Sequence, residues 1–136
     1  IGLKYSYADM VRTNEYLKIK GGEFSVLHGA DSLFLPALIM GCDGVVSGIS
    51  GVYPEPFVAL YKAYLKGDYE EARRQQRIAN NFIKVLKAGS NMAYFKAALT
   101  YRGIPAGHMR APQLDLLEEE KEELINQLNE LEGDLS

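Results

Sequence analysis

Several features that would restrict function are scarce in this sequence. Its 136 residues include one cysteine, Cys42, which excludes an intrachain disulfide and a zinc site built from several cysteines. Basic residues form no cluster larger than Arg73-Arg74 with Arg77, and the net charge is −3, so nucleic acid is not an expected partner. The longest apolar runs fall well short of the roughly 20 residues that span a bilayer. We therefore expect no membrane association and a cytoplasmic location.

The overall composition is that of a folded globular protein, with 47% apolar and 24% charged residues. A chain of this length makes one domain or part of one. It begins at Ile1 rather than at methionine, inside the strand-like segment Ile1 to Tyr5. We therefore expect the sequence to be a piece of a longer protein.

Short strand candidates alternate with helical segments in the first half of the chain. The candidates are Ile1 to Tyr5, Phe24 to Leu27, and Gly44 to Val46. This alternation predicts βα units and an α/β fold with parallel strands. Asp9 is expected to cap the helix after the first strand.

Only helices are expected after Gly67. Asp68 with Glu71 predicts a capping box, Ser90 is expected to cap the next helix, and a final amphipathic helix follows. We divide the chain into 1–66, three βα units, and 67–136, a helical extension. The apolar face of the final helix is expected to include Leu117, Leu124, Leu128 and Leu131.

Lys4 is the main candidate for chemistry. It lies in an apolar strand, where burial would disfavour the ammonium form and leave a neutral amine able to attack a ketone. The alternative is a strand-end lysine that extends its charge into solvent. The residues alone leave both interpretations open.

The segment Gly2-Leu3-Lys4-Tyr5-Ser6 resembles the Schiff-base strand of the dihydrodipicolinate synthase and N-acetylneuraminate lyase superfamily. Further segments match that family in order and spacing: His28 to Ser32, Gly41 to Ser47, Leu65 to Asp68, Lys96 to Leu99, and Arg110 with Pro112. The resemblance implies the C-terminal part of a (β/α)8 TIM barrel, strands 6 to 8, plus additional helices. Since three strands cannot close a barrel, the other strands are expected from an absent N-terminal half or a partner chain.

The resemblance also implies site residues. Lys4 would form a covalent imine with a small-molecule 2-keto acid, without a metal or another cofactor. Gly29 would let the backbone approach the substrate, while Asp31 and Ser32 would bind hydroxyls or, alternatively, cap a helix. Further substrate-binding candidates are Val46, Ser47, Gly48 and Ser90. Intact relatives commonly form tetramers.

The family's carboxylate-binding Thr/Ser pair and its proton-relaying tyrosine precede the sixth strand and have no counterpart here. This chain alone is therefore expected to be inactive.

The substrate is less well specified. Lys4-Tyr5-Ser6 lacks the Lys-Glu-Ala pattern common in dihydrodipicolinate synthases, which favours an aldolase acting on a 2-keto-3-deoxy sugar acid. Dihydrodipicolinate synthase and N-acetylneuraminate lyase are alternatives, and Ser32 argues mildly against the latter. A further alternative is a non-catalytic half-barrel that serves as an assembly module.

Overall fold

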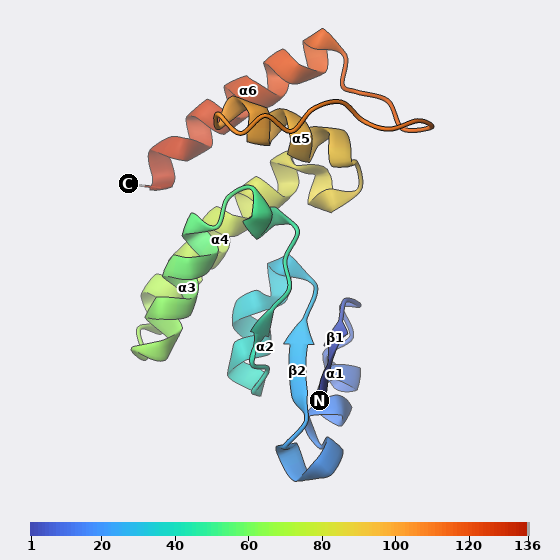
Figure 1. The fold of residues 1–136 in the computed structure, drawn as a ribbon. Coiled ribbons are helices and arrows are strands. Elements are labelled where there is room, and N and C mark those ends of the chain that lie inside the picture. Colours follow the sequence, from blue (N-terminus) through green and yellow to red (C-terminus); the bar gives the residue numbers. More distant parts are fainter. Residues whose placement is uncertain (136) are drawn as a thin grey trace.

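Three short parallel strands form a sheet at one end of the molecule (Figure 1). The computed structural model describes residues 1–135. In sheet order the strands are β1 (Gly2–Tyr5), β2 (Ser25–His28) and β3 (Gly44–Val45). Lys4 lies opposite Leu27, and Leu27 lies opposite Gly44. The predicted parallel βα arrangement is confirmed, with strand ends that differ by one residue.

Helices α1 (Met10–Leu17) and α2 (Phe34–Met40) supply the apolar side chains that bury one face of the sheet. Val26 is fully buried in a cluster with Ala37 and Cys42. Because side chains alternate along a strand, Lys4 and Leu27 point to the opposite face. Lys4 is exposed there, so this second face is open to solvent across the described residues.

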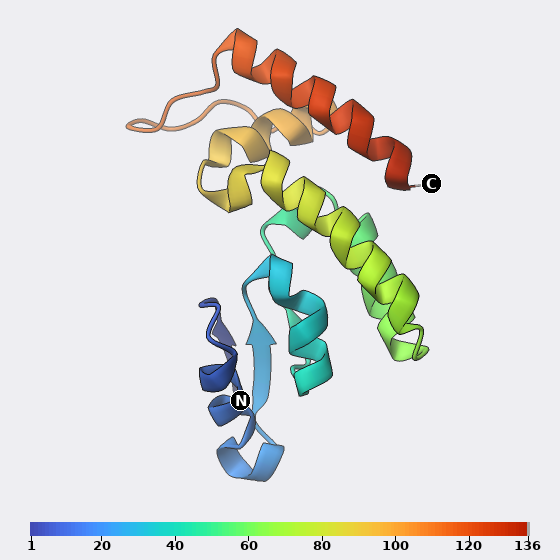
Figure 2. The ribbon, with the colours of Figure 1, turned by 180° about the vertical axis from the view of Figure 1, so that it is seen from behind.

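The second half of the chain forms a helical layer beyond the sheet (Figure 2). Its helices are α3 (Glu55–Leu65), α4 (Tyr69–Val85), α5 (Met92–Tyr101) and α6 (Glu118–Glu132). Gly67, with φ of 76°, makes the turn between α3 and α4, and the rings of Tyr53 and Phe82 stack 4.2 Å apart. The larger hydrophobic core contains residues from both sides of position 66, and the division of the chain there stays a prediction.

Two helix starts follow the local sequence signals. Asp9 and Asp68 each accept a backbone N–H bond in the first turn of α1 and α4, as expected for N-cap residues. The reciprocal half of the capping box is not seen, because the Glu71 carboxylate pairs with Arg74. No helix within residues 1–135 has both the length and the apolar character needed to cross a bilayer.

Two other expectations were wrong. Asn91, not Ser90, caps α5, because the Asn91 side chain accepts the N–H of Ala93 at 3.0 Å. Leu117 does not face the core, since it is 69% exposed, whereas the adjacent Leu116 is buried. The N-cap backbone at Leu117 is extended, which turns that side chain away from the helical face.

Candidate functional site

Lys4 lies near the carboxyl end of β1 on the open face of the sheet. Within the described chain Lys4 is exposed, which corresponds to the second of the two interpretations that the sequence left open. No described residue encloses the lysine from the open side. An apolar environment around Lys4 would therefore require further structure on this face.

The turn after β2 brings Gly29 against Lys4. The Gly29 N–H donates to the Tyr5 carbonyl at 2.7 Å, which draws the turn over the end of β1. A β-carbon at Gly29 would lie 2.6 Å from Cε of Lys4 and would also overlap the Ser6 side chain. A β-carbon at this position would therefore require both side chains to move.

Ser6 was not among the expected site residues. Its side chain nevertheless meets the same turn as Lys4, at the position of Gly29. The signal was available in the sequence, because residues two apart on an extended segment share a face. Ser6 thus adds a hydroxyl beside the lysine.

Asp31 follows the turn and starts the short 3-10 helix Asp31–Leu33 that precedes α2. Burial raises the pKa of this carboxyl, while hydrogen bonds from the Ser47 hydroxyl and the Ile49 amide and the charge of Lys4 act to lower it. Its Oδ1 is buried without a hydrogen-bond partner among residues 1–135. These contacts bring the carboxylate, the Ser47 hydroxyl and the Lys4 ammonium into one neighbourhood.

The segment after β3 supplies the next candidates. The Val46 N–H donates to the His28 carbonyl at 2.9 Å, which holds this segment beside the end of β2. Ser47 accepts the Ser50 N–H at 2.9 Å, which turns the chain back next to Asp31. Val46 is 43% exposed on the open face, and Gly48 is also exposed. This segment therefore borders the neighbourhood of Asp31.

Gly48 is linked to the Gly89-Ser90 segment by the ring of Phe95. A β-carbon at Gly48 would lie 3.2 Å from Phe95, and one at Gly89 would lie 3.5 Å from the same ring. Ser90 itself is exposed, and its recorded bond is a local one from its N–H to the Lys87 carbonyl at 2.9 Å. The ring of Phe95 thus lies next to both Gly48 and Gly89, and Ser90 follows Gly89 in the chain.

Ser32 lies apart from Lys4, Asp31 Oδ1 and Ser47. It is exposed within the 3-10 helix, and no recorded contact in the described part of the chain joins it to Lys4 or Ser47. The structure thus gathers Lys4, Gly29, Asp31 and Ser47, with Ser32 and Ser90 farther out.

His28 supports the turn from the covered face of the sheet. It is fully buried, and its Nδ1 accepts the N–H of Ala30 at 3.1 Å. Burial lowers the pKa of the imidazole. Because Nδ1 accepts this bond, the neutral ring carries its proton on Nε2, which is buried without a hydrogen-bond partner among the described residues. This bond fixes the backbone on which Gly29 sits.

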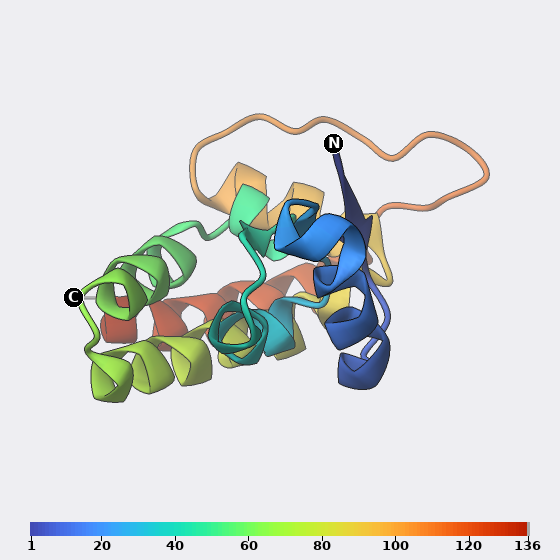
Figure 3. The same ribbon diagram turned by 90° about the horizontal axis from the view of Figure 1, so that it is seen from below.

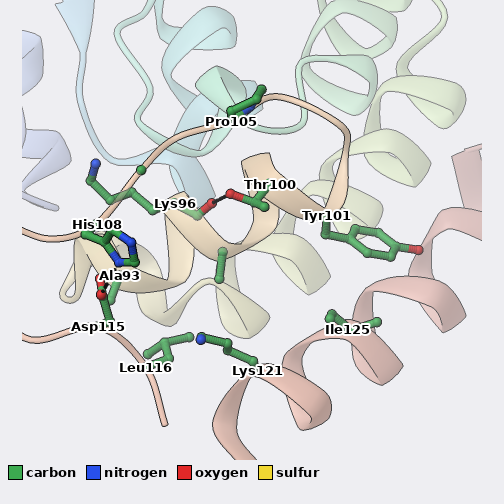
Figure 4. A pocket seen from close by; sticks show the side chains of 12 residues that line it. Ala93, Lys96, Thr100, Tyr101, Pro105, His108, Asp115, Leu116, Lys121 and Ile125 are labelled. Atoms are coloured by element: carbon green, nitrogen blue, oxygen red, sulfur yellow. Dashed lines mark hydrogen bonds and ion pairs between the residues drawn. The ribbon is translucent and has the colours of Figure 1, made fainter. Parts of the chain in front are cut away.

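A separate cavity of about 410 Å³ lies between α5, α6 and the connection joining them (Figure 4). Lys96 of α5 donates to the Ala106 carbonyl in this connection at 2.5 Å. His108 pairs with Asp115 at 2.8 Å. None of the candidate site residues lines the cavity. Figure 3 shows the connection as a wide arc outside the helices.

A small parallel sheet followed by several helices matches the fold of the dihydrodipicolinate synthase-like TIM-barrel superfamily. The chain belongs to the dihydrodipicolinate synthetase family, whose family model matches residues 1–131.

Relatives in this family are substantially longer than this chain. An uncharacterized DapA-like lyase of Halobacterium salinarum is 42% identical over 109 residues, which cover 80% of this chain and 36% of that protein. A 4-hydroxy-tetrahydrodipicolinate synthase of Methanospirillum hungatei is 32% identical over 132 residues, 96% of this chain and 44% of the relative. The chain therefore spans less than half the length of these relatives.

Solved structures give the same picture. Dihydrodipicolinate synthase from Aquifex aeolicus superimposes with a TM-score of 0.86 at 32% identity, covering 97% of this chain and 45% of that one. A variant of the Sulfolobus solfataricus 2-keto-3-deoxygluconate aldolase reaches a TM-score of 0.89 at 24% identity, covering 98% and 46%. The second likeness is one of fold alone.

Proposed function

We propose that this chain carries the Schiff-base lysine of a pyruvate-dependent aldolase, a lyase that reversibly cleaves a 2-keto-3-deoxy sugar acid into pyruvate and an aldehyde. The observation that carries this proposal is the contact between Lys4 and the Gly29 turn, with Asp31 and Ser47 beside it. Lys4 lies near the carboxyl end of β1, and the other groups follow the ends of the two neighbouring parallel strands. This is the edge at which barrel enzymes of this architecture perform chemistry.

In the proposed reaction, the neutral Lys4 amine attacks the keto carbon of the 2-keto acid, and the keto oxygen leaves as water. The imine then accepts the electron pair of the breaking C–C bond. The hydroxyl on the departing carbon of that bond loses its proton, and this carbon becomes the aldehyde carbon. The resulting enamine gains a proton at carbon, and water releases pyruvate and regenerates Lys4. No cofactor other than this covalent imine takes part.

The candidate residues divide between the two halves of the substrate. Gly29 lets the substrate approach the backbone next to the lysine, and the Val46 carbonyl faces the same region. Asp31, Ser47 and Ser6 hydrogen-bond hydroxyls of the aldehyde-derived half. Ser32, Gly48 and Ser90 serve only the far end of a longer substrate, because they lie at the margin of the cluster.

The open face is completed by further strands in this proposal. The sheet supplies strands 6 to 8 of a (β/α)8 barrel, and an N-terminal half carrying the other strands covers Lys4 and lowers the dielectric constant around it. Intact subunits assemble as a cytoplasmic homotetramer. The 136 residues alone are inactive, since they do not enclose a substrate.

A second candidate is the dihydrodipicolinate synthase reaction, in which pyruvate condenses with aspartate semialdehyde. It is favoured by the match to several proteins named 4-hydroxy-tetrahydrodipicolinate synthase at 30–35% identity. Both reactions use the same imine at Lys4, and they differ only in the aldehyde.

The test is reductive trapping on the full-length polypeptide. Incubation with pyruvate and borohydride is expected to add the mass of the reduced pyruvyl group to the peptide containing Lys4, and Lys4→Arg is expected to abolish the adduct. Pyruvate release from 2-keto-3-deoxygluconate, compared with condensation onto aspartate semialdehyde, then distinguishes the two candidates. An unmodified Lys4 in the full-length protein would rule out both.

A further inference from the structure

Gln76 lies on α4, in the helical layer, yet its side chain reaches the residues that follow the Gly29 turn. Its Oε1 accepts the Leu35 N–H at 2.8 Å, and its Nε2 donates to the Asp31 carbonyl at 3.2 Å and to Asn80 Oδ1 at 3.1 Å. The residue is 8% exposed. Both ends of a buried amide are thus engaged, and most of that bonding is directed at the start of α2.

One of these bonds supplies an acceptor that the start of α2 lacks. The first N–H groups of a helix have no acceptor within it, and Leu33, at the N-cap of α2, contributes no side-chain cap. Gln76 provides the acceptor from 41 positions away in sequence. On the other side of the turn, His28 accepts the Ala30 N–H. The backbone of the turn is therefore fixed at both ends by buried side chains.

We propose that Gln76 is a positioning residue that holds the Asp31 main chain, so that the Asp31 carboxylate meets hydroxyls of the aldehyde-derived half of the substrate. Gln76 acts through Asp31 and touches no substrate atom. The inference rests on the proposed function, which gives Asp31 its role. No recorded contact joins Gln76 to Lys4, so imine formation with pyruvate does not depend on Gln76.

Gln75 provides a matched control. It neighbours Gln76 on α4 and is also 8% exposed, but within the described part of the chain its side chain donates to Glu71 alone. Gln76→Met and Gln75→Met therefore each replace one buried amide by an apolar chain of similar length. Only Gln76→Met removes the bonds to the Leu35 N–H and the Asp31 carbonyl.

The experiment compares both variants in the full-length polypeptide. Gln76→Met is expected to raise KM for 2-keto-3-deoxygluconate about tenfold, because a displaced Asp31 carboxylate would lose about one hydrogen bond to the substrate. Gln75→Met is expected to raise this KM less than about twofold. Borohydride trapping of pyruvate on Lys4 is expected to proceed at the wild-type rate in both variants. This split between trapping and KM would not arise from general damage to the fold.

Two results would overturn the inference: equal KM values for the two variants, or a loss of trapping in Gln76→Met that parallels the rise in KM. Failure of the proposed function looks different, because the wild-type protein itself would then form no pyruvate adduct.

Gln76→Glu keeps the inference testable if Gln76→Met does not fold. The ionised glutamate retains the acceptor for Leu35 but loses the donor to the Asp31 carbonyl, whereas the protonated carboxyl has both. The ratio of KM in Gln76→Glu to KM in wild type is therefore expected to decrease as pH is lowered. A ratio independent of pH would contradict the role of the donor.

Discussion

His28 joins the covered face of the sheet to the turn that carries Gly29. Its ring is fully buried, its Nδ1 holds the Ala30 N–H, and the edge of Tyr5 lies against it with ring centroids 6.1 Å apart. Protonation of Nδ1 would break the bond to Ala30 and place a charge in an apolar site. The neutral ring is therefore part of the folded structure.

The pH dependence of stability follows from this residue. Because burial lowers the pKa of His28 in the folded state below its ordinary 6.5, the unfolded chain binds the proton first as pH falls. We expect stability to be highest above pH 6.5 and to decrease below it, by at most about 1.4 kcal/mol per pH unit from this group, down to the folded-state pKa. Urea unfolding of the full-length protein between pH 7 and 5 measures the slope.

His28→Asn is the control for this prediction, since the asparagine oxygen can replace Nδ1 as acceptor but does not titrate. Its slope is expected to be shallower than that of the wild type over the same pH range. Identical slopes would show that His28 does not bind a proton preferentially in the unfolded chain.

Arg102, at the end of α5, connects three elements of the helical layer. Its guanidinium donates to the Val52 carbonyl and to the Glu55 carboxylate at the start of α3, and it lies 4.4 Å from the centroid of the Tyr53 ring. The Tyr53 hydroxyl in turn donates to Glu132 of α6 at 2.8 Å. Arg102 and Tyr53 together thus couple the beginning of α3 to the ends of α5 and α6.

Replacing Arg102 by methionine is expected to lower the free energy of unfolding by about 1–3 kcal/mol, because a carbonyl and a partly buried carboxylate lose their partner. Arg73→Met is the matched control: Arg73 is exposed, makes no recorded ion pair in the described structure, and is expected to change stability by less than about 0.5 kcal/mol. Urea denaturation measures both changes. Equal midpoints for the two variants would contradict the coupling.

The helix starts show which features were predictable from the sequence. Asp9 and Asp68 were identifiable as caps because each bonds a backbone group three positions away. Ser90 and Asn91 are adjacent residues that can both cap, so the local pattern did not select between them. The bonds from Gln76 to Leu35 and Asp31, and from Arg102 to Glu55, join positions more than 40 residues apart and leave no local signal.

In the candidate site too, features set by neighbouring residues were predictable from the sequence, whereas features set by distant parts of the chain were not. The parallel strands and the glycine after β2 were predictable, and their register brings Lys4, Gly29 and Asp31 together. The exposure of Lys4 was not, because it depends on what covers the second face of the sheet and not on the residues next to the lysine. Sequence patterns thus locate the lysine but do not give its environment.

Within the described residues, the sheet has one face covered by helices and one face open to solvent. β1 and β3 are the edges of the sheet, and each has one side without a strand partner among residues 1–135. Parallel strands are normally buried on both faces, and unpaired edges readily accept another strand. The proposed barrel satisfies both requirements at once, since added strands pair with the edges while they enclose Lys4.

Hydrogen exchange tests this completion. We expect the outward-facing amides of Gly2–Tyr5 to exchange at least about tenfold more slowly in the full-length polypeptide than in the 136-residue chain, because an added strand would accept their hydrogen bonds. Buried amides of α4 serve as the internal control, since that helix is bonded within itself and is expected to be equally protected in both forms. Equal exchange in β1 would mean that the rest of the polypeptide does not extend this sheet. Protection of the 136-residue chain that increases with its concentration would instead indicate pairing between copies, as in the half-barrel assembly module, and would remove the need for an N-terminal half to cover Lys4.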